Sequence, residues 1–208
     1  MSSSPDLAKD PRMIDYRKSI DYLDISLLNL MTERMRVVEK IILIKRLQNV
    51  DLKQSEARRE DMKKLIEMSV ELKMESVFFQ RILNLIFQDA IEQFESVSSD
   101  PQAEHHEIIC KGLRIDSLRQ TLYNLDRTLC LLLAERFKIV KRIGIYKHEL
   151  KVPPLDPVRW EQVLNNKIKI ARALGVSVSL IKEIFNAIHE VSLSIEENSL
   201  QSVQSQHA

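Results

Sequence analysis

Residues 17–45 read RKSIDYLDISLLNLMTERMRVVEKIILIK, and residues 119–147 read RQTLYNLDRTLCLLLAERFKIVKRIGIYK. A shift of 102 positions aligns the two stretches without a gap. A fixed period of this length indicates two copies of one folding unit. The identical positions include charged residues, which a hydrophobic core does not need, so these residues are the candidates for function: Arg17/Arg119, Asp24/Asp126, Glu33/Glu135, Arg34/Arg136 and Lys45/Lys147.

Each repeat is expected to form one long helix followed by two shorter ones. Apolar residues recur at helical spacing, and no strand pattern occurs. The expected helices cover residues 13–49, 55–72 and 75–97 of the first copy, and 115–150, 157–174 and a segment after Ser177 in the second. Asp156-Pro157 predicts a helix start, Gly175 predicts a helix end, and Gly144 is expected to be a tolerated weak point. The fold class is therefore all-α.

The division of the chain follows the repeats. We expect tails at 1–12 and 201–208, repeats at 13–97 and 113–200, and a polar linker at 98–112. A long helix and two short ones cannot bury the apolar stripe of the long helix alone. Two such repeats can bury it if their long helices intertwine in antiparallel fashion, as a pseudo-dimer within one chain.

Composition excludes several classes of partner. In 208 residues, 31 Lys and Arg nearly balance 30 Asp and Glu, so bulk charge does not favour nucleic acid or an anionic membrane. The apolar run 129–134 is too short to span a bilayer, and no apolar signal segment follows Met1. A cytoplasmic protein is expected.

The cysteines and histidines do not predict a metal site. Cys110 and Cys130 lack metal-ligand spacing, and are expected to be a linker thiol and a buried helix thiol. His105 and His106 are adjacent but have no second pair of ligands nearby. We expect no metal and no cofactor.

The repeated cations predict two pockets. Arg136 and Lys147 are eleven residues apart, or close to three helical turns, and share a face. Arg119 lies too far along the same helix to join them. In an antiparallel pair, however, Arg17 reaches the Arg136/Lys147 face, and Arg119 reaches the equivalent face with Arg34 and Lys45. Any one of these cations could be an ordinary solvated side chain, but their repetition in both copies favours binding sites.

The chain resembles the helical, type II chorismate mutases over nearly its whole length. The resemblance rests on the charged matches above and on three further stretches. These are Leu133-Ala134-Glu135-Arg136, Asp156-Pro157-Val158-Arg159, and Ile188 with Ser192. In that family two identical chains exchange long helices to form two sites, so this chain is similar to such a dimer fused into one polypeptide.

The resemblance implies the rearrangement of chorismate to prephenate, without nucleophile, metal or cofactor. Arginines would hold the two carboxylates of the substrate, and a lysine and a hydrogen-bond donor would stabilise negative charge on the ether oxygen. Lys147 and Glu196 would act on the ether oxygen, Asp156 would lie near the hydroxyl and Ser192 near a carboxylate. The substrate-binding residues implied are Arg17, Arg136, Lys147, Asp156, Arg159, Trp160, Ser192 and Glu196.

Two positions of this site depart from the family pattern. Trp160 occupies the place of a glutamate that binds the ring hydroxyl, and Glu196 occupies that of a donor that is often Gln. Only a protonated Glu196 donates a hydrogen bond, so its pKa would have to be raised by burial.

The other site keeps only its cations, Arg119, Arg34 and Lys45. The aligned positions hold Gln54, Arg58, Ala90 and Phe94 for the family's Asp, Glu, Ser and donor. A register that instead uses Arg59-Glu60 breaks the ungapped alignment downstream. We expect this site to be catalytically inactive and either an anion-binding site or a scaffold.

Two other functions fit the same residues. One is a lyase that removes pyruvate from isochorismate, for which the changed hydroxyl contact at Trp160 would be suitable. The other is a non-catalytic relative that binds a small dicarboxylate or a protein partner, in which Trp160 fills the pocket. The products formed from chorismate and isochorismate distinguish these functions.

Overall fold

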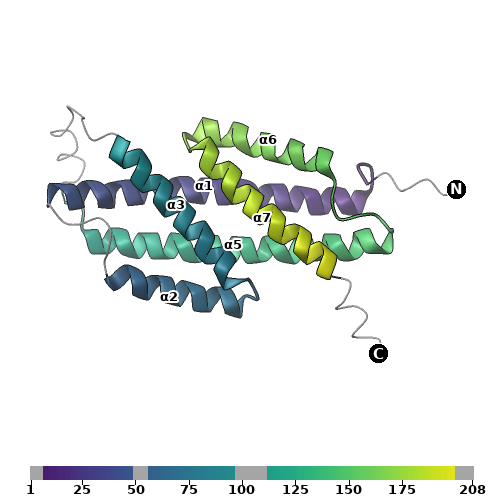
Figure 1. Ribbon diagram of the computed structural model, residues 1–208, viewed down its shortest axis with the longest axis horizontal. Coiled ribbons are helices and arrows are strands. Elements are labelled where there is room, and N and C mark those ends of the chain that lie inside the picture. The colour runs from purple at the N-terminus through teal and green to yellow at the C-terminus, as the bar shows by residue number, and fades with distance from the viewer. Residues whose placement is uncertain (1–6, 49–55, 97–111, 200–208) are drawn as a thin grey trace. The chain divides into compact units, whose positions relative to one another are not determined.

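A computed structural model describes residues 7–48, 56–96 and 112–199, with side chains at 7–48, 59–92 and 112–199. The described residues form six helices and no strand (Figure 1). The helices are α1 (Pro11–Leu47), α2 (Glu56–Glu71), α3 (Ser76–Ser96), α5 (Ile115–Glu149), α6 (Pro157–Leu174) and α7 (Val178–Asn198). The all-α class and three helices per repeat are confirmed, and every predicted boundary lies within two residues of the observed one.

The chain divides into two compact units, and neither is one sequence repeat. Unit 1 contains Met1–Leu28 and Leu132–Ala208, and unit 2 contains Asn29–Leu131. Each unit therefore includes a segment of α1 and a segment of α5, that is, a long-helix segment from both repeats. The expected boundaries of the repeats at 13–97 and 113–200 stay a prediction.

The two long helices run antiparallel within each unit. In unit 1 Tyr146 donates to Asp10, and Arg136 donates to Asp24. Residues later in α5 thus contact residues nearer the N-terminus, as in an antiparallel pair. In unit 2 Arg34 pairs with Asp126, and Lys45, later on α1, lines one pocket with Arg119, which comes before Asp126 on α5. The shorter helices complete each unit: α6 lies beside α7 in unit 1, and α2 beside α3 in unit 2 (Figure 1).

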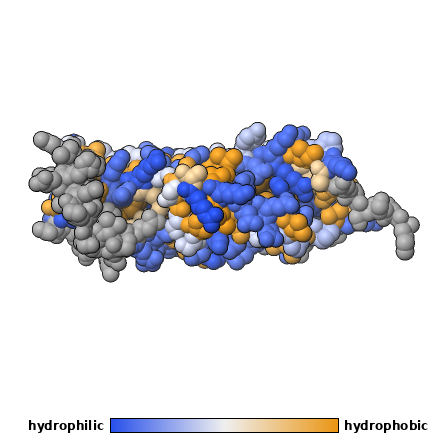
Figure 2. All heavy atoms as spheres, turned by 90° about the horizontal axis from the view of Figure 1, so that it is seen from above, coloured by the Kyte–Doolittle hydropathy of each residue, from blue (hydrophilic) through white to orange (hydrophobic). Residues whose placement is uncertain are grey.

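The core follows the repeated apolar pattern. Ile82 and Ile86 of unit 2 are fully buried, as are their counterparts Ile184 and Ile188 in unit 1. The face in Figure 2 mixes hydrophilic and hydrophobic residues. None of the described helices has the length and apolar character needed to cross a membrane.

The ends of α6 are formed as its sequence predicts. Asp156 is the N-cap and accepts a hydrogen bond from the Arg159 N–H, and Pro157 is the first helical residue. Gly175 ends the helix at φ +71°, where glycine avoids the strain that a Cβ brings. Ser177 then caps α7 by accepting from the Leu180 N–H.

The equivalent end of α2 uses a lysine instead. Lys73, which lies 102 positions before Gly175, adopts φ +59°. The Met74 N–H donates to the Ser69 carbonyl, as the Val176 N–H donates to the Ala171 carbonyl. The same left-handed helix end is thus built once with glycine and once with a residue that is strained there.

Replacing Lys73 by glycine should therefore stabilise the protein. We expect Lys73→Gly to raise the free energy of unfolding by about 0.5 kcal/mol, because relief of left-handed strain exceeds the added entropy of the unfolded chain. Urea denaturation measures the change. The matched control is Lys63→Gly within α2, which should lower stability by about 1 kcal/mol. A loss of stability in both variants would contradict the strain at Lys73.

Candidate functional site

Unit 1 contains a pocket of about 130 Å³ lined by α1, α5, α6, α7 and the segment before α6. All eight residues that the sequence analysis assigns to the first site line this pocket: Arg17, Arg136, Lys147, Asp156, Arg159, Trp160, Ser192 and Glu196. Arg17 comes from the first repeat and the other seven from the second. What these side chains bind stays a prediction.

Arg136 is buried and is held by two hydrogen bonds. Its Nε donates to Asp24 Oδ1 at 2.8 Å, and its Nη1 donates to Ser192 Oγ at 2.9 Å. All three side chains are buried, and the Ser192 hydroxyl in turn donates to the Ile188 carbonyl. These two bonds use two of the five guanidinium N–H groups, so both N–H groups of Nη2 and one of Nη1 are left for a ligand.

A buried lysine supports the aspartate that holds Arg136. Lys167 is fully buried, and its Nζ lies 3.2 Å from Asp24 Oδ2 and 3.0 Å from Asp21 Oδ1. Asp21 Oδ2 in turn lies 3.6 Å from Arg159 Nη2. The helical spacing of apolar residues does not predict this network, although the repeat offers a signal. Lys167 aligns with Leu65, a core residue, and a lysine at a core position requires partners.

Lys147 and Glu196 are in direct contact in the lining of the pocket. Lys147 Nζ donates to Glu196 Oε2 at 2.8 Å and also to the Pro154 carbonyl. Burial raises the pKa of the Glu196 carboxyl, and Lys147 and Arg136 oppose that shift only in part. A raised pKa is what a hydrogen-bond donor at this position needs, because the Glu196 carboxyl then keeps its proton to higher pH.

Gly144 lets α7 approach α5 beside these two residues. A Cβ at Gly144 would lie 2.7 Å from Ser199 Oγ and 2.8 Å from Glu196 Cα. The sequence analysis treated this glycine only as a weak point of the helix. Its packing role was missed because nothing local to the sequence shows which backbone passes there.

We expect Gly144→Ala to displace the end of α7 that carries Glu196. The clash with α7 backbone should cost about 2 kcal/mol of folding free energy, since overpacking at a backbone contact cannot be relieved by a rotamer change. Thermal denaturation measures the loss. Ala134→Gly, a change in the opposite direction elsewhere in α5, is the helix-propensity control. Unchanged stability in Gly144→Ala would show that the helices separate without cost.

Trp160 forms one wall of the pocket. Its ring stacks on His189 with centroids 3.9 Å apart and an interplanar angle of 4°. Burial lowers the pKa of His189, and Arg136 and Lys147 lower it further, so this imidazole is neutral at neutral pH. His189 also lines the pocket, and sequence reasoning missed it because a single histidine on a helix has no distinguishing spacing.

Arg17 lies near a like charge, Arg159, in the lining of the pocket. Its Nη1 donates to the Leu7 carbonyl at 3.3 Å. Burial lowers the pKa of Arg17, and the neighbouring Arg159 lowers it further, while Asp156 raises it. An anion placed between the two guanidinium groups would relieve their repulsion.

The charge of the lining suits a doubly negative ligand. The pocket is lined by four cations, Arg17, Arg136, Lys147 and Arg159, and three carboxylates, Asp21, Asp156 and Glu196. The formal excess is one positive charge, and it becomes two when Glu196 carries a proton. Such a pocket can hold a dianion and place donors around it.

A family model for chorismate mutase type II matches this chain twice, at residues 16–95 and at residues 118–197. The chain belongs to that family. The resemblance seen in the sequence is thereby confirmed, as is the tandem arrangement of two family domains. No curated protein and no solved structure matches the chain.

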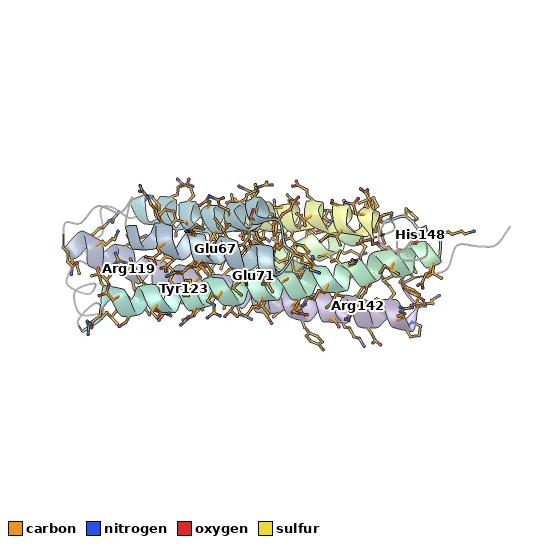
Figure 3. The ribbon with its side chains drawn as sticks, turned by 90° about the horizontal axis from the view of Figure 1, so that it is seen from below. Glu67, Glu71, Arg119, Tyr123, Arg142 and His148 are labelled. Atoms are coloured by element: carbon orange, nitrogen blue, oxygen red, sulfur yellow. The ribbon has the colours of Figure 1, made fainter. Side chains whose placement is uncertain are left out.

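Unit 2 contains the pocket that corresponds to the second family site. Arg34, Lys45 and Arg119 line it together, as the sequence analysis expects. Arg119 and Tyr123 lie one turn apart on α5 (Figure 3). Gln54 is outside the described residues, and the side chains of Arg58 and Phe94 are outside them as well. Ala90 is buried. Whether this pocket is inactive in chorismate mutase chemistry stays a prediction.

No metal-binding chemistry appears in the described part of the chain. Within residues 7–48, 56–96 and 112–199 no group of three His, Cys, Asp or Glu residues could hold a metal ion. Cys130 is a free, buried thiol, and burial raises its pKa to about 11, so it is unreactive at neutral pH. Cys110, His105 and His106 lie outside the described residues.

Proposed function

We propose that this chain is a chorismate mutase with one working pocket, in unit 1. The observation that carries the proposal is the convergence of Arg17 from the first repeat with Arg136 and Lys147 from the second on one pocket. The reaction breaks an ether C–O bond and forms a C–C bond within one molecule. It needs a compact conformation and stabilised negative charge, but no nucleophile or cofactor.

Each charged group has a task in this reaction. Arg17 and Arg136 bind the two carboxylates of chorismate, and their separation selects the folded conformation of the substrate. The ion pairs of Asp24 with Arg136 and Lys167 hold Arg136 in place before substrate arrives. Fixed donors of this kind cost no reorganisation as the transition state forms.

Lys147 and Glu196 act on the ether oxygen as it gains negative charge. The proton on Glu196 and the ammonium of Lys147 both donate to this oxygen, and the raised pKa of Glu196 supports that protonation state. Asp156 lies near the substrate hydroxyl and Ser192 near a carboxylate. Arg159 lines the pocket.

The direct test is product identification. The purified protein is incubated with chorismate and, separately, with isochorismate, and the products are separated by chromatography. Prephenate from chorismate is the expected result. Pyruvate with salicylate from isochorismate, and no prephenate, would assign the lyase reaction instead. Absence of any product from either compound would support a binding protein.

Isochorismate pyruvate lyase is the second candidate function because of the residue at position 160. Trp160 stands where the family places a glutamate for the ring hydroxyl, and it stacks on His189. An aromatic wall supplies no charged partner for a hydroxyl at the chorismate position. A substrate with its hydroxyl elsewhere on the ring loses less by this change.

The pH dependence of turnover tests the task of Glu196. Because its pKa is raised and the protonated form donates, activity should fall as pH rises through that pKa. Glu196→Gln keeps a donor at every pH, so its profile should be flat over the same range. The rate of prephenate formation against pH measures both. A flat profile in the unmodified protein would remove Glu196 from the mechanism.

A further inference from the structure

The unit 2 pocket differs from the unit 1 pocket by a matched pair of replacements. Tyr123 stands where unit 1 has Asp21, and Leu65 stands where unit 1 has Lys167. An ion pair has thus been exchanged for apolar and aromatic surface. The cavity, of about 100 Å³, has eight aliphatic, Met or Phe residues in its lining: Val38, Ile41, Ile42, Met62, Leu65, Phe87, Ile91 and Leu122.

The guanidinium of Arg34 in this pocket has a donor without an acceptor among the described residues. Its Nε and Nη2 donate to Asp126, as the buried ion pair requires. Its Nη1 is buried and finds no acceptor among the described residues. In unit 1 the equivalent Nη1 of Arg136 donates to Ser192, but the residue 102 positions before Ser192 is Ala90. An unpaired buried guanidinium N–H is costly, and an oxygen brought by a ligand would relieve that cost.

The charge of the lining indicates the kind of ligand. Arg34, Lys45 and Arg119 line the pocket with two carboxylates, Asp61 and Asp126. Among the lining residues that the structure describes, the formal excess is one positive charge. The pocket therefore matches a monoanion better than a dianion.

We propose that the unit 2 pocket binds a small monocarboxylate that carries an apolar ring or chain. The carboxylate lies between Arg34 and Arg119 and accepts from the Nη1 of Arg34. The apolar body packs against Leu65, Ile42 and Leu122. This site is separate from the reaction proposed for unit 1, and its test needs no turnover.

Isothermal titration calorimetry with 3-phenylpropanoate is the test. The unmodified protein should bind one equivalent of 3-phenylpropanoate. The alcohol 3-phenylpropan-1-ol, which has the same apolar body without the charge, should bind at least about tenfold more weakly, because charge-assisted hydrogen bonds are lost. Glutarate, a dianion without a ring, should also bind more weakly. Equal affinity for the alcohol, or no binding of 3-phenylpropanoate, would overturn the proposal.

Three variants locate the probe. Arg119→Ala should weaken its binding about fivefold by removing a cation from the lining of the pocket. Ala90→Ser should also weaken binding severalfold, because the new hydroxyl accepts from Arg34 Nη1 as Ser192 does from Arg136. Arg17→Ala, the repeat counterpart of Arg119→Ala in unit 1, should leave the affinity unchanged. The opposite pattern, in which only Arg17→Ala weakens binding, would place the probe in unit 1 and overturn the proposal. Circular dichroism shows that each variant remains helical.

Discussion

Arg17→Ala should lower kcat/KM for chorismate by about 100-fold or more, because one charge-assisted carboxylate contact and the orientation it provides are both lost. Arg17 belongs to the first repeat, whereas Arg136, Lys147 and Glu196 belong to the second. The loss should appear in kcat as well as in KM, since the contact holds the reactive conformation and not only the bound one. Loss of chorismate absorbance measures the rate.

Arg119→Ala is the matched control for this prediction. It removes the same residue type at the same point of the repeat, but from unit 2. Most of the chorismate mutase activity should remain. Equal loss of activity from both variants would contradict a single working pocket. Full activity in Arg17→Ala would contradict the proposed binding of a substrate carboxylate by Arg17.

Lys167→Leu should destabilise unit 1 by about 3 kcal/mol, since it removes the cation beside the buried Oδ2 of Asp24. Lys167 is fully buried against Asp21 and Asp24, and Asp24 is itself fully buried. Activity should fall together with stability, because Asp24 positions Arg136. Chemical denaturation gives the free energy, and kcat at a temperature well below the transition gives the functional loss.

Unit 2 supplies the compensating change. There Leu65 and Tyr123 stand in the places of Lys167 and Asp21, and Asp126 still pairs with Arg34. The double variant Asp21→Tyr/Lys167→Leu should therefore recover more than about 1 kcal/mol of the loss, as contacting charged residues couple. Strict additivity of the two single changes would show that the ion pair is not a unit.

The sequence predicts most of the fold for physical reasons that are local. Helical spacing of apolar residues sets the six helices, and Asp156, Gly175 and Ser177 set their ends through backbone hydrogen bonds. The antiparallel arrangement follows from the need to bury the stripe of each long helix. That arrangement is sufficient to bring Arg17 to Lys147.

What the sequence did not predict depends on packing between distant segments. A lysine such as Lys167 has the same local pattern whether it is solvated or buried. Gly144 differs from an ordinary weak point only because the backbone of α7 passes beside it. The stack of Trp160 on His189 likewise depends on the register of α6 against α7. Comparison of the two repeats position by position is the one signal in the sequence that marks Lys167.

Both pockets draw on both repeats, and this has a consequence for how the protein can change. In a dimer of identical chains, every substitution alters two sites at once, so neither site can be lost without the other. Once the two copies share one gene, each position is encoded separately, and the halves of a single helix come under different selection. The N-terminal part of α1 then lines one pocket and its C-terminal part lines the other. One cavity can thereby change its lining residues while the lining of the other stays the same.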